Sequence, residues 1–327
     1  MDLRNLLLIE FEELVMPSGA FIAAPSKKYN ACWLRDQLYC AISYYYLRNY
    51  PKLIRSFQVV FDILDKYYLE IKRGKIIHAK YDAITFEQIT KDWGHHQLDA
   101  IGLLLYFSAF FESLGIRILR KKDREIIKTL ISYLNLHEYW EKPDNGIWED
   151  KLNLHASSIG ATLIGLIYTT KKDIESVPRH MIEKGWRSLE KILPNESPDQ
   201  EVNMSQLSLI WPYNIVSKKI ANIILERIKE KLVQKHGLNR YLGDDYYRSD
   251  DGISAEWSLG FFWLAIAEFQ RRHIKEAEYW LIRGLDQMTD NNHIPELYQN
   301  GKPNENTPLG WAMSFALIAL TLIKSKS

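Results

Sequence analysis

The residues best suited to chemistry in this sequence are two glutamates in polar, turn-forming stretches. Glu149 follows Trp148 in "GIWED", and Glu296 lies in the tight "HIPELY" turn. Two carboxyl groups that face one glycosidic bond can hydrolyse it, because one donates a proton to the leaving oxygen while the other activates water or attacks carbon. Burial against Trp148 would raise the pKa of Glu149, so we predict Glu149 as the acid and Glu296 as the base.

Tryptophans and planar polar groups recur in comparable stretches, among them "NACWLRDQLYC", "KDWGHHQLDAIG" and "RYLGDDYYRSDDGISAEW". Aromatic rings suit the apolar faces of a pyranose, and carboxylate, amide and guanidinium groups suit its vicinal hydroxyls. This combination predicts a pocket for an uncharged carbohydrate. The candidate substrate-binding residues are Trp33, Arg35, Asp36, Trp93, His95, Gln97, Asp99, Trp148, Glu256, Trp257 and Trp311.

Each candidate also has an ordinary structural explanation. Asp36 and Asp99 fall in the first turns of predicted helices, where a carboxylate complements the helix dipole without any ligand. Arg35 could form a local salt bridge with Asp36, and each tryptophan could simply fill the interior. Four other carboxylates compete with the two glutamates for the catalytic roles on chemistry alone: Asp36, Asp99, Asp150 and Glu256.

Several other functional classes lack support. There is no GxGxxG after a strand, no P-loop and no GxSxG elbow, which argues against dinucleotide binding, phosphoryl transfer and serine hydrolysis. His95 and His96 are adjacent, a spacing wrong for two metal ligands on one helix face, so neither a metal nor another cofactor is predicted. The "DD" pairs at 244–245 and 250–251 are too sparse for the Asp-rich metal motif of terpene cyclisation.

Composition is that of an ordinary globular protein. The 327 residues include 42 basic and 41 acidic side chains, so no global field favours nucleic acid or an anionic membrane. A helix spanning Cys32 and Cys40 would hold them more than two turns apart, so we expect reduced thiols and a cytoplasmic location. The first apolar run, in "MDLRNLLLIEFEELV", is too short and acid-interrupted for a signal peptide or membrane anchor.

The elements that must position these residues are helices. Apolar residues recur at three- and four-residue spacing through nearly the whole chain, while strict alternation is rare. The predicted helices span residues 1–15, 31–49, 52–72, 97–114, 122–139, 157–170, 178–193, 203–212, 217–235, 256–271, 274–288 and 307–324. Short links such as "NYP" and "RRH" join helices into antiparallel hairpins. Long connectors, rich in Gly, Pro and Asn, span 16–30, 73–96, 140–156, 194–202, 236–255 and 289–306.

Six hairpins, with the two terminal helices counted as one pair, would gather every long connector at one end of the molecule, which we call the mouth. We therefore predict a single unit, residues 1–327, folded as an all-α (α/α)6 barrel with inner and outer helices. An open solenoid is the alternative, but the segments repeat no pattern of fixed period. All the candidate tryptophans fall on or beside a long connector, which favours a pocket at the mouth over unrelated packing roles.

Several segments together resemble the glucoamylase-like enzymes of glycoside hydrolase family 15, whose relatives include a domain of the phosphorylase kinase α and β subunits. The segments are "WLRDQ", "IHAKYDAITFEQITKDWGHHQLDAIGLLLY", "NGIWEDKLNLHASSIGATLIGL", "RYLGDDYYRSDDGISAEW" and "IPELYQNGKPNENTPLGWA", which span nearly the whole chain. The second and third are especially similar to the phosphorylase kinase type. The resemblance implies an (α/α)6 barrel and inverting hydrolysis of α-glucosidic bonds from a non-reducing end.

The resemblance also implies roles for individual residues. It makes Glu149 the general acid and Glu296 the general base, and it makes Arg35 and Asp36 the pair that holds hydroxyls of the terminal glucose. Pocket positions match Trp33, Trp93, Glu256, Trp257 and Trp311. A matching motif contains His95, Gln97 and Asp99, whose individual roles the resemblance does not fix.

Two departures from the family bear on the substrate. Bacterial and archaeal members commonly carry an N-terminal β-sandwich domain, which we expect to be absent here, and the loops look short. We therefore expect a short α-glucoside, such as a maltose-like, isomaltose-type or trehalose substrate, and we hypothesise that self-association replaces the sandwich contacts. The alternative to an enzyme is a non-catalytic, regulatory carbohydrate-sensing module related to phosphorylase kinase α and β.

Overall fold

Helices make up most of the regular structure in the computed structural model, which describes residues 2–91 and 93–324. The helices are α1 (Leu3–Glu12), α2 (Leu34–Tyr46), α3 (Tyr50–Lys66), α4 (Tyr68–Lys72), α5 (Leu98–Ser113), α6 (Asp123–Leu136), α7 (Ala156–Lys171), α8 (Arg179–Ile192), η1 (Met204–Gln206), α9 (Leu207–Ile210), α10 (Lys218–Lys231), α11 (Leu259–Gln270), α12 (Ile274–Leu285) and α13 (Gly310–Lys324). None of the helices in these ranges combines the length and apolar character needed to cross a membrane.

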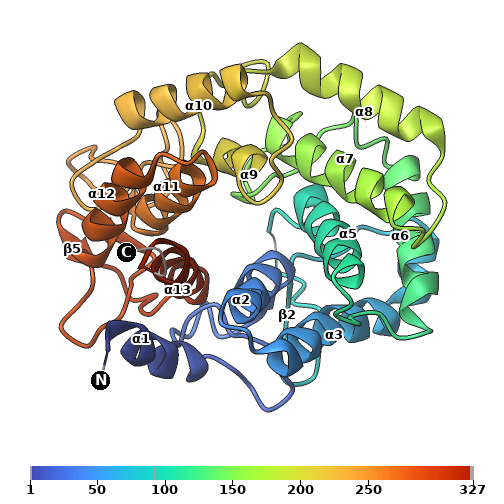
Figure 1. The fold of residues 1–327 in the computed structure, drawn as a ribbon, viewed down its shortest axis with the longest axis horizontal. Helices are drawn as coiled ribbons and strands as arrows, with labels where there is room; N and C mark the ends of the chain where they lie inside the picture. Colours follow the sequence, from blue (N-terminus) through green and yellow to red (C-terminus); the bar gives the residue numbers. More distant parts are fainter. Residues whose placement is uncertain (1, 92, 325–327) are drawn as a thin grey trace.

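The helices form two concentric rings (Figure 1). The inner ring runs through α2, α5, α7, α9, α11 and α13, and it closes because α13 packs against α2. Each inner helix leads into an outer helix, and α1 packs beside α13 to complete the last pair. The predicted (α/α)6 barrel is therefore confirmed.

The sequence explains which helices lie inside. The inner helix α13, "GWAMSFALIALTLIK", is apolar around its whole circumference, as expected of a helix with neighbours on every side. The outer helix α8 buries only Met181, Gly185, Leu189 and Ile192, which share one face, and its other face is polar.

Helix boundaries differ from the prediction mainly at the mouth. The predicted helix over 52–72 is divided at Tyr67 into α3 and α4, and the one over 203–212 is only the short η1 and α9. Strands replace the predicted helical starts at 31 and 256: β1 (Cys32–Trp33) pairs with β2 (Lys80–Tyr81), and β3 (Glu256–Trp257) pairs with β4 (Leu297–Gln299), which also pairs with β5 (Lys302–Pro303). Local periodicity cannot reveal such strands, because their hydrogen-bonding partners lie far away in the chain.

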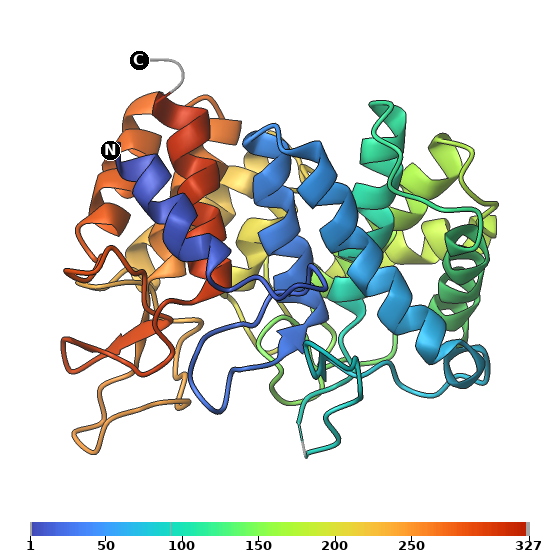
Figure 2. The ribbon, with the colours of Figure 1, turned by 90° about the horizontal axis from the view of Figure 1, so that it is seen from below.

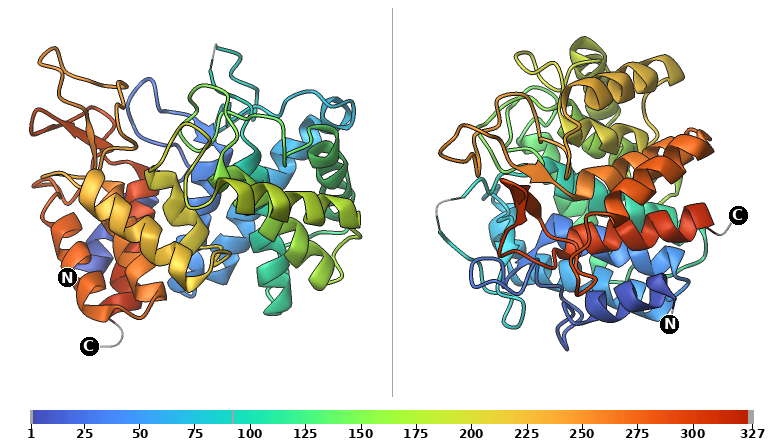
Figure 3. Two further views of the ribbon diagram at one scale, coloured as in Figure 1. Left: turned by 90° about the horizontal axis from the view of Figure 1, so that it is seen from above. Right: turned by 90° about the vertical axis from the view of Figure 1, so that its left-hand side faces the viewer.

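The long connectors gather at one end of the barrel, as predicted, and the short links lie at the other (Figures 2 and 3). The small antiparallel pairs tie these connectors together, with Trp33 opposite Lys80 and Trp257 opposite Leu297. The mouth is thus a hydrogen-bonded layer built on the ends of the inner helices.

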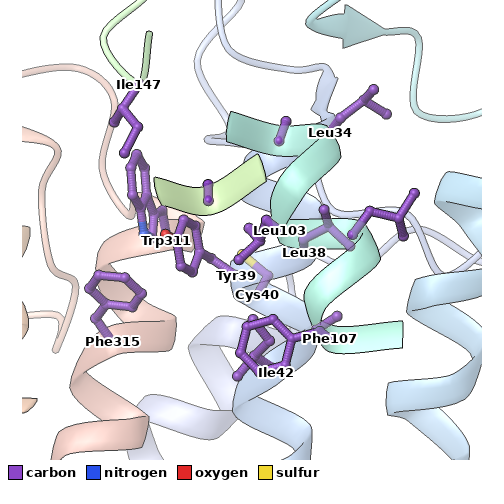
Figure 4. Packing of buried hydrophobic residues seen from close by; sticks show 14 of the residues in the cluster. Leu34, Leu38, Tyr39, Cys40, Ile42, Leu103, Phe107, Ile147, Trp311 and Phe315 are labelled. Carbon is purple, nitrogen blue, oxygen red and sulfur yellow. The ribbon is translucent and has the colours of Figure 1, made fainter. Parts of the chain in front are cut away.

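Buried apolar side chains pack between the inner helices, and Tyr39, Trp311 and Phe315 lie together among them (Figure 4). Tyr39 of α2 stacks on Trp311 of α13 with ring centroids 5.0 Å apart and planes 8° apart, and it meets Phe315 edge-on at 5.2 Å. Each such pair contributes about 0.5–1.5 kcal/mol beyond its buried area. The Tyr39 ring therefore holds the Trp311 ring in place.

Glycines bring α5 and α7 into close contact. A Cβ atom at Gly102 would lie 2.4 Å from the backbone carbon of Ala161, and one at Gly165 would lie 2.6 Å from the carbonyl oxygen of Gly102. The two inner helices therefore pack backbone to backbone, which leaves no room for a methyl group.

We predict that Gly102→Ala destabilises the protein by about 1–3 kcal/mol, because the added methyl meets backbone that cannot give way. Urea denaturation should show this as a lower transition midpoint. The control is Gly310→Ala, whose methyl would lie 3.3 Å from the sulfur of Cys40, a tight contact with a side chain that needs to shift by only a few tenths of an ångström. Equal stability of the two variants would contradict the close packing of α5 on α7.

Candidate active site

A cavity of about 200 Å³ opens at the mouth. It is lined by residues from the long connectors and the first turns of the inner helices: Tyr29, Trp33, Arg35, Asp36, Trp93, Gly94, Ile147, Trp148, Glu149, Asp150, Arg240, Tyr246, Trp257, Leu259, Glu296, Leu309 and Trp311. Pockets for drug-sized ligands start at about 300 Å³, so this cavity suits something smaller, such as one sugar ring. Both predicted catalytic glutamates and all the candidate tryptophans belong to this lining.

Glu149 is held by donors from two other connectors. Its Oε2 atom accepts the indole N–H groups of Trp33, at 3.3 Å, and of Trp93. Its Oε1 atom lies 3.0 Å from a terminal nitrogen of Arg35. The carboxyl group is therefore surrounded by hydrogen-bond donors, one of which is a cation.

The Trp148 ring has its own set of neighbours at the cavity. The Trp148 ring lies beside Trp257 and Trp311, with centroids 6.0 Å away in both cases, and its indole N–H donates to Oδ1 of Asn203 at 2.7 Å. Glu149 has a φ of 62°, a left-handed conformation that costs energy for any residue with a Cβ. Residues held in such conformations cluster at functional sites.

Gly94 allows the connector carrying Trp93 to reach Glu149. A Cβ atom at Gly94 would lie 2.3 Å from the Glu149 carbonyl oxygen, so any larger residue would separate the two segments. The position of Trp93 over the carboxylate thus depends on a residue that has no side chain.

Arg35 is a buried cation with several acceptors. It is only 4% exposed, and it donates to Oε1 of Gln97 at 2.8 Å, while Oδ2 of Asp99 lies 3.6 Å away. Gln97 and Asp99 do not line the cavity. Their predicted direct contact with substrate is therefore corrected: they orient Arg35, which also faces Glu149.

Asp36 lies beside this cation and lines the cavity, but none of the described residues donates a hydrogen bond to its carboxyl group. Burial raises the pKa of Asp36 to about 7, Arg35 opposes the rise, and the nearby Glu149 and Glu296 carboxylates add to it. The group is therefore available to a ligand, and it changes charge near neutral pH.

Glu296 occupies a different setting. It is 2% exposed, its Oε1 accepts the Tyr29 hydroxyl at 2.9 Å, and its Oε2 accepts the side-chain amides of Asn304 and Asn306 at 2.7 and 2.6 Å. Burial raises the pKa of Glu296, while the donors Asn306, Asn304 and Tyr29 hold it down. A carboxylate that is fixed by neutral donors and has a raised pKa is suited to accept a proton.

Sequence reasoning missed Arg240, Tyr29 and Tyr246 as cavity residues. The guanidinium carbon of Arg240 lies 4.8 Å from the ring centroid of Trp257 and 5.8 Å from that of Trp148. Its Nε and one terminal nitrogen donate to the two carboxylate oxygens of Asp244, at 2.7 and 2.6 Å. A signal was present, because Arg240 opens the quoted stretch "RYLGDDYYRSDDGISAEW" and stands four residues before a carboxylate.

Two predicted substrate-binding residues lie outside the cavity lining. His95 stacks on His78 with ring centroids 4.2 Å apart, and its two nitrogens contact the backbone at Ala79 and Lys91. Glu256 accepts the backbone N–H of His236 at the start of the β3–β4 pair. Their positions therefore indicate structural roles. Within the described ranges, no group of three or more His, Cys, Asp or Glu residues is arranged to hold a metal ion.

The chain is similar in sequence to known proteins. Residues 13–172 match the model of the family described as "Glycosyl hydrolases family 15". The chain is 25% identical over 300 residues to "Phosphorylase b kinase regulatory subunit alpha, skeletal muscle isoform" of Oryctolagus cuniculus, with 74% of this chain and 24% of that protein covered. It is 27% identical over 267 residues to the liver isoform of Mus musculus, with 68% and 21% covered. The chain therefore spans about a quarter of the length of these relatives.

Solved structures share the fold. "Glycosidase Wild Type" superposes with a TM-score of 0.82 at 19% identity, covering 98% of this chain and 97% of that one. "Glucoamylase from Saccharomycopsis fibuligera at atomic resolution" gives a TM-score of 0.69 at 15% identity, covering 99% and 96%. At these identities the similarity shows that the barrel architecture is shared. The chemistry must be argued from the residues of the cavity.

We predict that Asp36→Asn raises the free energy of unfolding at pH 8 by an amount on the order of a few kcal/mol. The pKa of Asp36 is raised on folding, so its folded form keeps a proton that the unfolded chain releases. The contribution of the protonated Asp36 to the free energy of unfolding is therefore complete below about pH 4, and it is lost as the pH rises toward 7. Thermal denaturation from pH 4 to 8 should show the advantage of the variant vanish at the acid end.

The matched control is Asp150→Asn, since Asp150 also lines the cavity but its side chain is 35% exposed. It should not reproduce the pH-dependent gain. A constant difference between Asp36→Asn and the parent protein across this range would show that desolvation of Asp36 is not the cause.

Proposed function

We propose that this chain, which matches the family 15 model over residues 13–172 and is similar to phosphorylase kinase α subunits, is an inverting exo-acting glycoside hydrolase of short α-glucosides. The observation that carries the proposal is that Glu149 and Glu296 line one small cavity in different polar surroundings. An acid and a base that act on one bond need such a difference.

In the proposed reaction, a terminal glucose unit enters the cavity and lies against tryptophan rings, with Arg35 and Asp36 at its hydroxyls. Glu149 protonates the glycosidic oxygen as the bond to the anomeric carbon breaks. Glu296 takes a proton from a water molecule, which attacks that carbon from the opposite face. This inverting course requires the two carboxyl groups to stand roughly 6.5–9.5 Å apart, whereas retention requires about 5–5.5 Å.

The acid role places a condition on substrate binding. Both oxygens of Glu149 accept contacts from donors of the protein, so a glycosidic oxygen can contact this carboxyl group only if one of the three contacts breaks. We infer that the substrate displaces one of these donors. The strained backbone at Glu149 and its place on a connector make a small movement there less costly than one within a helix.

The size of the cavity supports a short substrate. About 200 Å³ offers room for the unit that is released, and we propose maltose, isomaltose or trehalose as the substrate class. One solved structure with the same fold, "Glycosidase E335A in complex with glucose", holds glucose, which is the expected product here.

A second candidate function is a carbohydrate-sensing module without turnover. Its support is that both oxygens of Glu149 are already engaged by donors of the protein, together with the curated relatives, which are named as regulatory subunits. Such a module would bind the sugar in the same cavity and release no glucose.

We predict that Glu149→Gln and Glu296→Gln each lower the rate of glucose release by at least about 100-fold, because general acid–base catalysis contributes that much or more. Glucose release from maltose, isomaltose and trehalose is the measurement, and acarbose binding should survive in both variants. Glu256→Gln is the control, since Glu256 lies outside the cavity. A parent protein that binds these sugars but releases no glucose would establish the sensing function instead.

We also propose that the protein self-associates. Ile274, Tyr279 and Ile282 of α12 are 38%, 54% and 58% exposed, which places apolar side chains on the outside of the barrel. Sedimentation velocity should therefore give a species larger than 38.4 kDa that shifts toward the monomer in Ile282→Glu. A parent protein that is monomeric at every concentration would refute self-association.

A cytoplasmic location stays a prediction. Cys32 and Cys40 are both free and buried, as expected of a protein kept in a reducing compartment.

A further inference from the structure

A second pocket, of about 320 Å³, lies on the other side of the segment that carries Glu149. Ile147, Trp148 and Asp150 line both this pocket and the cavity, so the segment forms a shared wall. The remaining walls come from the connectors that begin and end near α7, η1 and β3.

Two residues that line the second pocket have buried polar atoms that no described residue satisfies. The hydroxyl of Ser205 is buried, with the residue 1% exposed, and it makes no hydrogen bond. The Nε2 atom of His155 is also buried without a partner, and this side chain is 12% exposed. Buried polar groups are nearly always paired, so these two call for a ligand or for ordered water.

His155 is charged at neutral pH. Burial opposes the charge, but Glu196, whose Oε1 lies 3.4 Å from Nδ1, and the nearby carboxylates of Asp144 and Asp99 raise the pKa of His155 to about 9. Its Nε2 atom therefore carries a proton and can donate to an oxygen of a ligand.

The charges of the lining select the class of ligand. Its ionisable side chains are four carboxylates and two cations: Asp150, Glu196, Asp199, Asp245, Lys151 and His155. This excess of negative charge disfavours a phosphate or a carboxylate. The lining also holds four side-chain amides. Those of Asn145, Asn153 and Asn203 donate within the protein, whereas the amide nitrogen of Gln200 donates to none of the described residues and can meet a ligand hydroxyl.

We propose that the second pocket binds a neutral polyhydroxylated ligand, a sugar or a short glucoside, at a site separate from the cavity. The hydroxyls of the ligand meet Ser205, His155 and the carboxamide of Gln200. This inference does not rest on turnover in the cavity, because it depends only on the groups of the second pocket.

The shared wall couples ligand binding in the second pocket to the geometry of the cavity. The indole N–H of Trp148 donates to Asn203 of the second pocket while its ring lines the cavity, and the hydroxyl of Tyr241 holds Asp150 at 2.8 Å. A ligand that competes for Asn203 or Asp150 therefore acts on the same segment that positions Glu149.

The test uses glucose as the ligand and Ser205→Ala as the variant. Since the Ser205 hydroxyl has no protein partner, its removal costs the fold no hydrogen bond. Crystals soaked in glucose should show a sugar in the second pocket of the parent protein. Saturation-transfer NMR should give about tenfold weaker binding at that site in Ser205→Ala, as expected for loss of one hydrogen bond to a buried group.

The matched control is Ser208→Ala, because the Ser208 hydroxyl is also buried and unpaired but lies outside the second pocket. It should leave glucose binding unchanged, and Asp36→Asn should weaken the cavity site alone. A second pocket that holds only water when glucose fills the cavity would overturn this inference and leave the proposed hydrolase standing. Equal affinities of Ser205→Ala and Ser208→Ala for glucose would also overturn it. Glucose found in the second pocket alone would support this inference and would contradict sugar binding in the cavity.

Discussion

The site depends on one desolvated cation, the guanidinium of Arg35. Removing such a group from water costs several kcal/mol, and the fold offsets this cost only by bringing acceptors to it from elsewhere in the chain. Gln97 and Asp99 come from the start of α5, and Glu149 comes from the connector before α7. Three consecutive hairpins are thereby fixed at the mouth by a single side chain.

This arrangement gives the two glutamates unlike surroundings within one cavity. Glu149 faces a cation and two indole N–H groups, whereas Glu296 is enclosed by a hydroxyl and two carboxamides. Trp311 connects this cavity to the buried aromatic residues, because its ring stacks on Tyr39 and also belongs to the cavity lining. The same inner helices that close the barrel therefore also supply the rigid floor on which a sugar ring would rest.

Much of the architecture could be predicted because it rests on properties that are local in the chain. Helical periodicity and connector length were sufficient for the barrel and for the end at which the tryptophans gather. What could not be predicted depends on pairing between distant segments. The strand Cys32–Trp33 forms only by pairing with Lys80–Tyr81, and the strand Glu256–Trp257 only by pairing with Leu297–Gln299. The indole of Trp148 likewise bonds to Asn203, which is distant in the sequence.

Composition could not distinguish the residues that line the cavity from those behind it. Gln97, Asp99 and Glu256 have the right chemical groups for a sugar, yet they face Arg35 or the backbone. Arg240 was overlooked because its spacing from Asp244 indicates a salt bridge, whereas its place in the cavity wall depends on Trp257, which is distant in the sequence.

Closure of the ring has a consequence for how the protein is made. Of the helices that form this barrel, α13 is synthesised last and must insert between α2 and α11, and Tyr29 meets Glu296 across 267 residues of chain. Until then the apolar sides of the first inner helices have no permanent neighbour, and such exposed surface invites aggregation. Biosynthesis of this barrel therefore ends with its most non-local step, so a chaperone that shields the nascent helices would act up to the moment of closure.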